Sequence, residues 1–463
     1  MDEPAYVARL ESADADELAR VITSAADDEE RVLREYLGDD RFDYMRELAL
    51  RSTGVTLQAA EERGNVVVTH GIMGSSLSAR RRIGGLDLIW IDLLELVFGR
   101  LDRLRLNEDG SGGYLPEYDV CATGILKLFY GELILSLRSN WNVYTFCFDW
   151  RKDLNTSARE FEAQIDANFG HDAPVHIVAH SMGGLLARTF IKNRQERWER
   201  MWDDESSGGL GGRLVMLGTP NHGSFAIPLL INGLGGVIKT LARVNVRLAL
   251  PDLLQITNSF VGTYQMLPSL HVMPEMEPLY RSETYGDLDV PQGRLDNARA
   301  HHDELRNVVD AERMVYVAGY DRWTPNGIDD FSRMREAATY SQTREGDGTV
   351  PHQLGLLETP EGERIRTYFV DEEHVDLARN RQVIQAMDGL LEIGTTGALS
   401  EEILPAAGVV SEPEPETPPA TQTIDAERVQ TLVDRAEAAR ADPEAEALLP
   451  EQRELEEILL HGL

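Results

Sequence analysis

The stretch AHSMGG, residues 179–184, places a serine where it could act as a nucleophile. An alternating apolar run, VHIVAH, precedes Ser181 and a helical pattern follows it, so a strand should end and a helix begin at this residue. This is the context of a nucleophile elbow, a strained turn that exposes the serine hydroxyl and requires small residues two positions before and after it. Ala179 and Gly183 meet that requirement. Free N–H groups of the following helix would face negative charge that develops at the site.

A serine hydroxyl becomes a good nucleophile when a histidine takes its proton and a carboxylate orients that histidine. In an elbow protein the acid follows a later strand and the histidine follows the last one. Asp347 lies in a Gly-flanked loop after the run RMVYVAG, and His374 comes directly after the run IRTYFV. The sequence therefore predicts Ser181, Asp347 and His374 as a catalytic triad.

Other residues compete for two of these roles. His352 is close to Asp347 but precedes the last predicted strand, so it is the weaker candidate for the base. Glu372 or Asp376 could be the acid, although each is very near His374 in sequence for a partner that should come from across the sheet.

The loop VTHGIMGSSLS should complete an oxyanion hole, because the second donor of such a hole comes from the loop after the first core strand. Gly71 permits close backbone approach, so the N–H of Ile72 is the expected donor, paired with that of Met182. Met73 could replace Ile72 by a shift of one position, or contact substrate. His70 is expected to brace the loop.

The DWR stretch has two interpretations. Asp149 and Arg151 either border the acyl or head-group pocket at the end of a strand, or form an internal ion pair that fixes the loop beside the oxyanion hole; the second is favoured. No metal site is expected, because the 11 histidines show no HExxH or carboxylate spacing. The adjacent His301 and His302 lie in a polar stretch and should be solvated.

Short apolar runs that alternate with helical patterns must position these residues. This alternation predicts an α/β fold, with a mostly parallel sheet covered by helices on both faces. Residues 222–310 are too long for a simple connection and should form a largely helical lid within a domain at 61–398. The predicted strands are 65–70, 143–148, 175–180, 213–218, 313–319 and 365–370.

The two ends of the chain differ from the middle in charge. Residues 1–62 carry 17 acidic and 7 basic groups, and residues 411–463 carry 14 and 4. Residues 1–60 should be a small helical region, 399–424 a Pro/Glu-rich linker, and 425–463 either a docking helix pair or a flexible, marginally helical tail. Either end could bind a protein partner.

Composition excludes several classes of protein. A net charge of −34 argues against nucleic acid and anionic membranes as electrostatic partners. No apolar run reaches the ~20 residues of a membrane span; FAIPLLINGLGGVI is short and broken by Pro228, Asn232 and glycines. Two cysteines, one of them in a predicted strand, and the absence of a signal-like N-terminus lead us to expect a reduced, cytoplasmic protein with no cofactor.

Five stretches in order, HGIMGS, FDWRKD, AHSMGG, LGTPNHGS and GDGTVP, resemble those of α/β-hydrolases of the lipase type, in particular the lecithin:cholesterol acyltransferase-like branch. The resemblance spans residues 64–390 and implies Ser181, Asp347 and His374 as nucleophile, acid and base, with Ile72 in the oxyanion hole. It implies hydrolysis of lipid or acyl esters, or acyl transfer to an alcohol. A partner-regulated effector that carries a hydrolase domain is a further alternative. The disulfides and signal peptide of secreted members are lacking, so a lipoprotein role is not implied.

Overall fold

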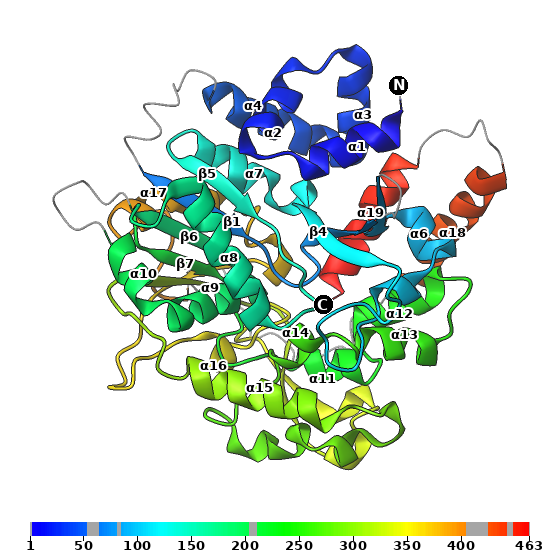
Figure 1. Cartoon of the computed structure of the whole chain (residues 1–463), viewed down its shortest axis with the longest axis vertical. Helices are drawn as coiled ribbons and strands as arrows, with labels where there is room; N and C mark the ends of the chain where they lie inside the picture. The colour runs from blue at the N-terminus through cyan, green and yellow to red at the C-terminus, as the bar shows by residue number, and fades with distance from the viewer. Residues whose placement is uncertain are drawn as a thin grey trace, which may run out of the picture.

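The computed structural model describes residues 2–52, 64–80, 85–202, 211–403, 425–441 and 448–462. Its centre is a six-stranded, fully parallel sheet in the order β11-β8-β7-β6-β1-β5 (Figure 1). All six predicted runs are strands of this sheet: β1 (Asn65–Thr69), β5 (Asn142–Phe146), β6 (Val175–His180), β7 (Leu214–Leu217), β8 (Met314–Gly319) and β11 (Arg366–Val370). β6, β7 and β8 are buried throughout, which explains why they read as continuous apolar runs.

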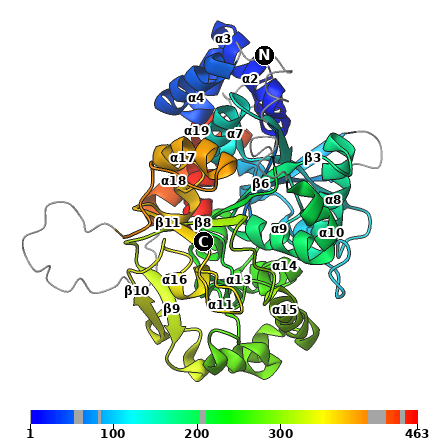
Figure 2. The ribbon, with the colours of Figure 1, turned by 90° about the vertical axis from the view of Figure 1, so that its left-hand side faces the viewer.

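Helices cover both faces of this sheet, as predicted. α7 (Lys127–Arg138) packs against α17 (Arg381–Glu392) on one face, and α8 (Leu154–Phe169) packs against α9 (Met182–Asn193) on the other (Figure 2). α10 (Gln195–Met201) continues from α9. Ser181 and His374 lie at the carboxyl ends of their strands, where the ligand sites of open parallel sheets are found.

Two antiparallel units were not among the predicted strands. One is a three-stranded sheet in the order β3-β2-β4, formed by β2 (Ser75–Arg80), β3 (Leu86–Trp90) and β4 (Asp119–Ile125). The other pairs β9 (Thr324–Ile328) with β10 (Tyr340–Thr343). Short connecting helices complete this part of the chain: α6 (Leu93–Phe98), η1 (Leu101–Leu104), η4 (Phe331–Arg333), η5 (Ala337–Thr339), α16 (His352–Gly355) and η6 (His374–Asp376).

The segment predicted as a lid, residues 222–310, is helical and lies beyond the carboxyl edge of the sheet (Figure 1). It holds α11 (Ala226–Ile231), α12 (Gly236–Val244), α13 (Leu250–Thr257), α14 (Val261–Tyr264), η2 (Pro274–Tyr280), η3 (Ser282–Leu288) and α15 (Gln292–Leu305). The stretch Ala226–Val244 is long and apolar enough to cross a membrane by length and composition, but 67% of it is buried inside the molecule. Here these apolar residues serve as core.

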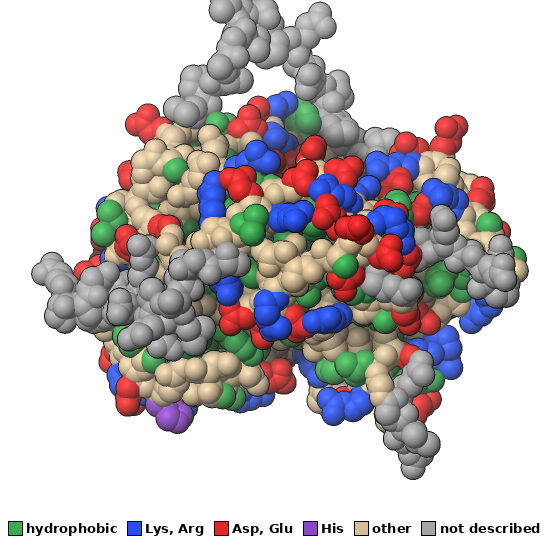
Figure 3. Space-filling view, turned by 90° about the horizontal axis from the view of Figure 1, so that it is seen from above, with side chains coloured by type: hydrophobic (Ala, Val, Ile, Leu, Met, Phe, Trp, Pro, Cys, Tyr) green, Lys and Arg blue, Asp and Glu red, His purple; other side chains and the backbone are tan. Residues whose placement is uncertain are grey.

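Four N-terminal helices form a layer on α7: α1 (Glu3–Ser12), α2 (Ala15–Ser24), α3 (Asp27–Leu37) and α4 (Asp39–Ser52). Their apolar stripes are buried, and Asp14 caps α2 by accepting the N–H of Glu17 at 2.7 Å. Figure 3 views the molecule from this end and shows arginines interleaved with the acidic side chains. Pairs such as Arg34–Glu30 therefore place some of the acidic groups next to a cation.

The C-terminal segment is a docked pair of helices, the first of the two alternatives for residues 425–463. α18 (Ala426–Ala441) contacts α6 and α12, and α19 (Leu449–His461) contacts α3, α6, α12 and η6. The Tyr36 hydroxyl lies 3.1 Å from the carboxylate of Glu456, so the two ends of the chain meet. Within the described residues, the structure therefore shows docked helices in place of a flexible tail. Residues 404–424 of the predicted linker lie outside the described residues.

Candidate active site

Ser181 occupies the sharp turn between β6 and α9. Its backbone has φ 53° and ψ −125°, a region that costs strain for any residue with a side chain. The small residue two positions after Ser181 has a steric reason, because a Cβ on Gly183 would lie 2.6 Å from the carbonyl oxygen of His70. The turn therefore presents Oγ at the sheet edge only because this close approach is possible.

The structure brings the three predicted triad residues together. His374 Nε2 lies 2.8 Å from Ser181 Oγ, and His374 Nδ1 lies 2.8 Å from Asp347 Oδ2. The other carboxylate oxygen, Asp347 Oδ1, accepts the N–H groups of Thr349 at 3.0 Å and Val350 at 2.7 Å. Asp347 is thus fixed as an acceptor, and a histidine protonated at Nδ1 has Nε2 free to accept the serine proton.

The competing residues have other partners. His352 Nε2 bonds the carbonyl oxygen of Gly319 at 2.8 Å. Asp376 pairs with Arg379 at 2.6 Å and with His461 at 3.3 Å, and Glu372 accepts from Asn380 at 3.0 Å. The geometry at Ser181 therefore favours His374 and Asp347 over these alternatives.

The predicted oxyanion loop lies against the serine. A Cβ on Gly71 would be 2.7 Å from the Cβ of Ser181, so glycine is what allows the loop this close. Ile72 lines the same pocket as Ser181, and Met182 is the first residue of α9, whose N–H has no acceptor within the helix. Met73 is buried and its carbonyl accepts from Trp90 Nε1 at 3.1 Å.

Asp149 and Arg151 form a buried ion pair, the second interpretation of the DWR stretch. Two hydrogen bonds of 2.8 and 2.7 Å join them, and Arg151 Nη1 also donates to the carbonyl of Leu104 at 2.7 Å. Burial by itself would raise the pKa of Asp149, but the charge and hydrogen bonds of Arg151 outweigh it, so the pKa is lowered. The pair holds two loops together.

Two side chains that the sequence did not single out support the site. The Tyr130 hydroxyl accepts the N–H of Gly71 at 3.2 Å and lies 2.8 Å from Nδ1 of His180, whose Nε2 lies 2.9 Å from the carbonyl of His374. Burial, and then the charge of His374, lower the pKa of His180 to about 3. A neutral His180 accepts from Tyr130 and donates to that carbonyl, which links the oxyanion loop to the histidine loop. In the sequence, only the position of His180 directly before Ser181 pointed to a role for it at the site.

His70, His301 and His302 are among the other buried histidines. His70 stacks on Phe148 and accepts the N–H of Phe148 at 3.1 Å, and burial lowers its pKa to about 4, so it occupies the expected bracing position. The prediction that His301 and His302 are solvated is wrong, since they are only 2% and 5% exposed. Their helix, α15, packs against α9, which places this polar stretch at an internal interface.

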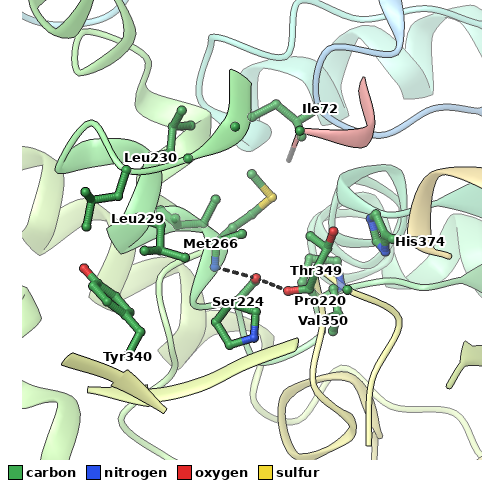
Figure 4. Close-up of a pocket in the computed structure, with 18 of the residues that line it drawn as sticks. Ile72, Pro220, Ser224, Leu229, Leu230, Met266, Tyr340, Thr349, Val350 and His374 are labelled. Carbon is green, nitrogen blue, oxygen red and sulfur yellow. Dashed lines mark hydrogen bonds between the residues drawn. The ribbon is translucent and has the colours of Figure 1, made fainter. Parts of the chain in front are cut away.

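An apolar pocket opens beside Ser181 and His374 (Figure 4). Its lining contains no Asp, Glu, Lys or Arg, and its apolar side chains include several from α11 and the β9–β10 unit. The Ser224 hydroxyl donates to the carbonyl of Thr349 and accepts the N–H of Ala226, while the Tyr340 hydroxyl donates to Met334, so these polar groups are already satisfied. Within the described residues, no group of three or more His, Cys, Asp or Glu could hold a metal ion.

The pocket therefore suits an uncharged, apolar group held next to the serine. Such a group matches an acyl or alkyl chain better than a charged metabolite, because no ion-pairing partner lines the wall.

Comparison with known proteins gives three kinds of similarity. The lecithin:cholesterol acyltransferase family model matches residues 134–285, which contain Ser181 and much of the lid segment. The uncharacterized protein YJR098C of Saccharomyces cerevisiae is 28% identical over 148 residues, 29% of this chain and 21% of that protein, so the match spans about a fifth of the relative.

Solved structures are more distant. The Tle4–Tli4 complex aligns with 72% of this chain and 98% of its own, at 13% identity and a TM-score of 0.44. The mature Bacillus licheniformis lipase BlEst2 aligns with 72% of this chain and 93% of its own, at 15% identity and a TM-score of 0.34. The family match falls on the nucleophile turn of a fully parallel sheet, so this part of the chain, with the strand–turn–helix that holds Ser181, is similar to the lecithin:cholesterol acyltransferase family.

Proposed function

We propose that this protein is a serine hydrolase that cleaves carboxylic esters of lipid or lipid-like acyl groups. One observation carries the proposal: the hydrogen-bonded series Ser181–His374–Asp347 ends at an uncharged, apolar pocket. A nucleophile, its base and a place for an apolar acyl group thus occur at one point of the fold.

In the proposed reaction, Ser181 Oγ attacks the ester carbonyl carbon while His374 Nε2 accepts the hydroxyl proton. The carbonyl oxygen becomes an oxyanion and accepts hydrogen bonds from the N–H groups of Ile72 and Met182. Collapse of this intermediate breaks the bond to the alcohol, which leaves with the proton held by His374. Asp347 stays ionised and stabilises the protonated ring.

The acyl group is then joined to Ser181 as an ester. Water attacks it and gives a proton to His374, the second intermediate collapses, and Ser181 recovers the proton as the carboxylic acid leaves. The protein groups in these steps are the triad side chains and the two backbone N–H groups, and no cofactor is needed for the balance of atoms.

Transfer of the acyl group to an alcohol is the second candidate, and the acyltransferase family match is the observation that favours it. The two reactions differ only in the molecule that attacks the acyl-enzyme. Product analysis with and without added long-chain alcohol separates them, because transfer yields a new ester in addition to free acid.

Labelling with a fluorophosphonate, together with a p-nitrophenyl ester series from acetate to palmitate, tests the proposal. Wild type should label and hydrolyse esters, and Ser181→Ala should lose the label and at least about 1,000-fold in kcat because the attacking oxygen is gone. Ser332→Ala is the matched control, since this serine is exposed and its hydroxyl donates to Asp330 close by in the sequence. A wild type that neither labels nor turns over any ester contradicts the function; full activity in Ser181→Ala contradicts the assignment.

A further inference from the structure

The residue that follows α19 forms part of the pocket wall. Gly462 lines the same pocket as Ser181, Ile72 and Gly236, although it is separated from the nearest of them by more than 200 positions. In Figure 4 the C-terminal ribbon, drawn in red, passes directly beside Ile72. A segment outside the family match therefore contributes to the surface that substrate would touch.

The contact between this segment and the lid is made by backbone atoms. The N–H of Val237 donates to the carbonyl of Gly462 at 3.0 Å. A Cβ on Gly462 would lie 2.8 Å from the nitrogen of Val237 and 2.9 Å from the carbonyl carbon of Gly236. Gly462 has φ −82°, which any residue can adopt, so it is the space and not the backbone conformation that excludes a larger residue.

A polar surface groove lies on the other side of the same contact. Gly236 and Gly462 line this groove too, together with Arg428, Arg453 and His461. The two glycines thus separate an apolar hollow beside the nucleophile from a polar hollow at the surface.

The position of this wall is held from outside the lid. Gln452 accepts the N–H of Leu93 at 2.6 Å and donates to the carbonyl of Ile91 at 2.9 Å. Glu457 accepts two hydrogen bonds of 3.0 Å from Arg379 and one of 3.3 Å from Arg41. α19 is therefore fixed at two points along its length, and Gly462 follows as its rigid end.

We propose that the contact of Gly462 with the N-terminus of α12 is a specificity determinant: it limits the size of the substrate group that lies on the Ile72 side of Ser181. This inference rests on the proposed ester hydrolysis. If Gly462 and the N-terminus of α12 separate, the pocket joins the surface groove and longer substrate groups can extend toward the surface. Ser181, His374 and Asp347 do not change.

The test compares the p-nitrophenyl ester series on wild type, Gly462→Ala and a chain that ends at His461. Both variants open the wall, the first by steric repulsion and the second by removal. The ratio of kcat/KM for palmitate to that for acetate should rise at least about tenfold, the smallest discrimination that one methylene gives in an apolar pocket. Gly293→Ala is the control, because a Cβ at this exposed lid position meets nothing within 4 Å.

An unchanged palmitate-to-acetate ratio in both variants, or an equal loss on every ester, overturns the inference while hydrolysis by wild type keeps the proposed function intact. If wild type hydrolyses no ester and takes no fluorophosphonate, the proposed function itself fails. Thermal unfolding of each variant shows whether it is folded, and the shortened chain decides the question if Gly462→Ala is not.

Discussion

Tyr130 joins two loops that must keep a fixed separation. Its hydroxyl accepts from Gly71, beside the expected oxyanion donor, and bonds His180, which in turn holds the carbonyl of His374. Hydrogen bonds in a buried site act as positioning devices, because each loop can shift only if a buried polar atom loses its partner.

Tyr130→Phe should therefore slow turnover by between about 10- and 100-fold with little change in KM, since sub-ångström errors in the nucleophile and oxyanion geometry act on the transition state. Tyr144→Phe removes a hydroxyl that bonds Gln164 near the surface and should leave kcat unchanged. Steady-state kinetics on a short ester measures both. Equal kcat values for the two variants would mean that Tyr130 has only a packing role.

Residues whose role depends on chain order could be predicted, and residues whose role depends on packing could not. Ser181, Asp347 and His374 each follow a strand, and strand ends of a parallel sheet meet at one edge. Tyr130 lies within α7, 50 residues before His180, and no pattern in the sequence indicates that its hydroxyl reaches that ring. The burial of His301 was missed for the same reason.

Among the secondary-structure elements, α19 carries the most unusual set of contacts. Glu457 sits between Arg379, from the segment after the histidine loop, and Arg41 of α4. Burial by itself would raise the pKa of Glu457, but the hydrogen bonds and charge of Arg379 lower it, so the group is a carboxylate at neutral pH. The ion pair is partly shielded from solvent, where such pairs are worth more than at an open surface.

Glu457→Gln should lower the free energy of unfolding by about 1–3 kcal/mol, because two arginines lose their shared acceptor charge. It should also reduce hydrogen-exchange protection over residues 449–462 more than elsewhere. Glu454→Gln, which removes a more exposed pairing with Arg428, is the matched control and should change both quantities little. Uniform loss of protection along the chain would show that Glu457 does not act through α19.

The main sheet was predictable at the level of elements because its strands are continuously apolar. β2 was not, since its sequence SSLSAR has neither a continuous apolar run nor a clean alternation, and its pairing with β4 contains a register shift. The docking of α19 depends on polar contacts from several distant helices. Helical spacing alone gave two alternatives for residues 425–463.

For the whole molecule, buried histidines make the free energy of unfolding depend on pH in the acid range. Burial is the main cause that lowers the pKa of His70 and His302 to about 4, of His180 and His222 to about 3, and of His301 well below its usual value. The unfolded chain binds protons below pH ~6.5 that the folded chain does not bind, so these groups make stability fall as pH falls from there toward 3.

Buried carboxyl groups have the opposite effect. Burial raises the pKa of Glu11 and of Glu456, and the charge of Glu11 raises that of Glu456 further. The folded state keeps protons that the unfolded state releases above pH ~4.5, so these two groups lower stability as pH rises. The dependence of stability on pH is the sum of both effects. The contribution of one histidine is therefore measured by comparing wild type with a variant that lacks it.

His301→Leu provides that comparison, because both nitrogens of His301 lack a hydrogen-bond partner among the described residues. Between pH 6.5 and 5 the variant should lose stability more slowly than wild type, by up to about 1.4 kcal/mol per pH unit. Urea unfolding at several pH values measures this slope. A curve for His301→Leu that runs parallel to that of wild type would contradict the prediction.

The contact of Tyr36 with Glu456 joins residues that are 420 positions apart in the chain. During synthesis at about 5–20 residues per second, the N-terminal helices leave the ribosome roughly 20–80 seconds before α19 exists to cover Tyr36. Throughout that interval the N-terminal helices lack α19 and Tyr36 is open to water and to chaperones; the nucleophile turn is made within the same interval, before α19. A premature stop in the last turn of α19 would therefore release a chain with its triad residues present and its pocket wall missing.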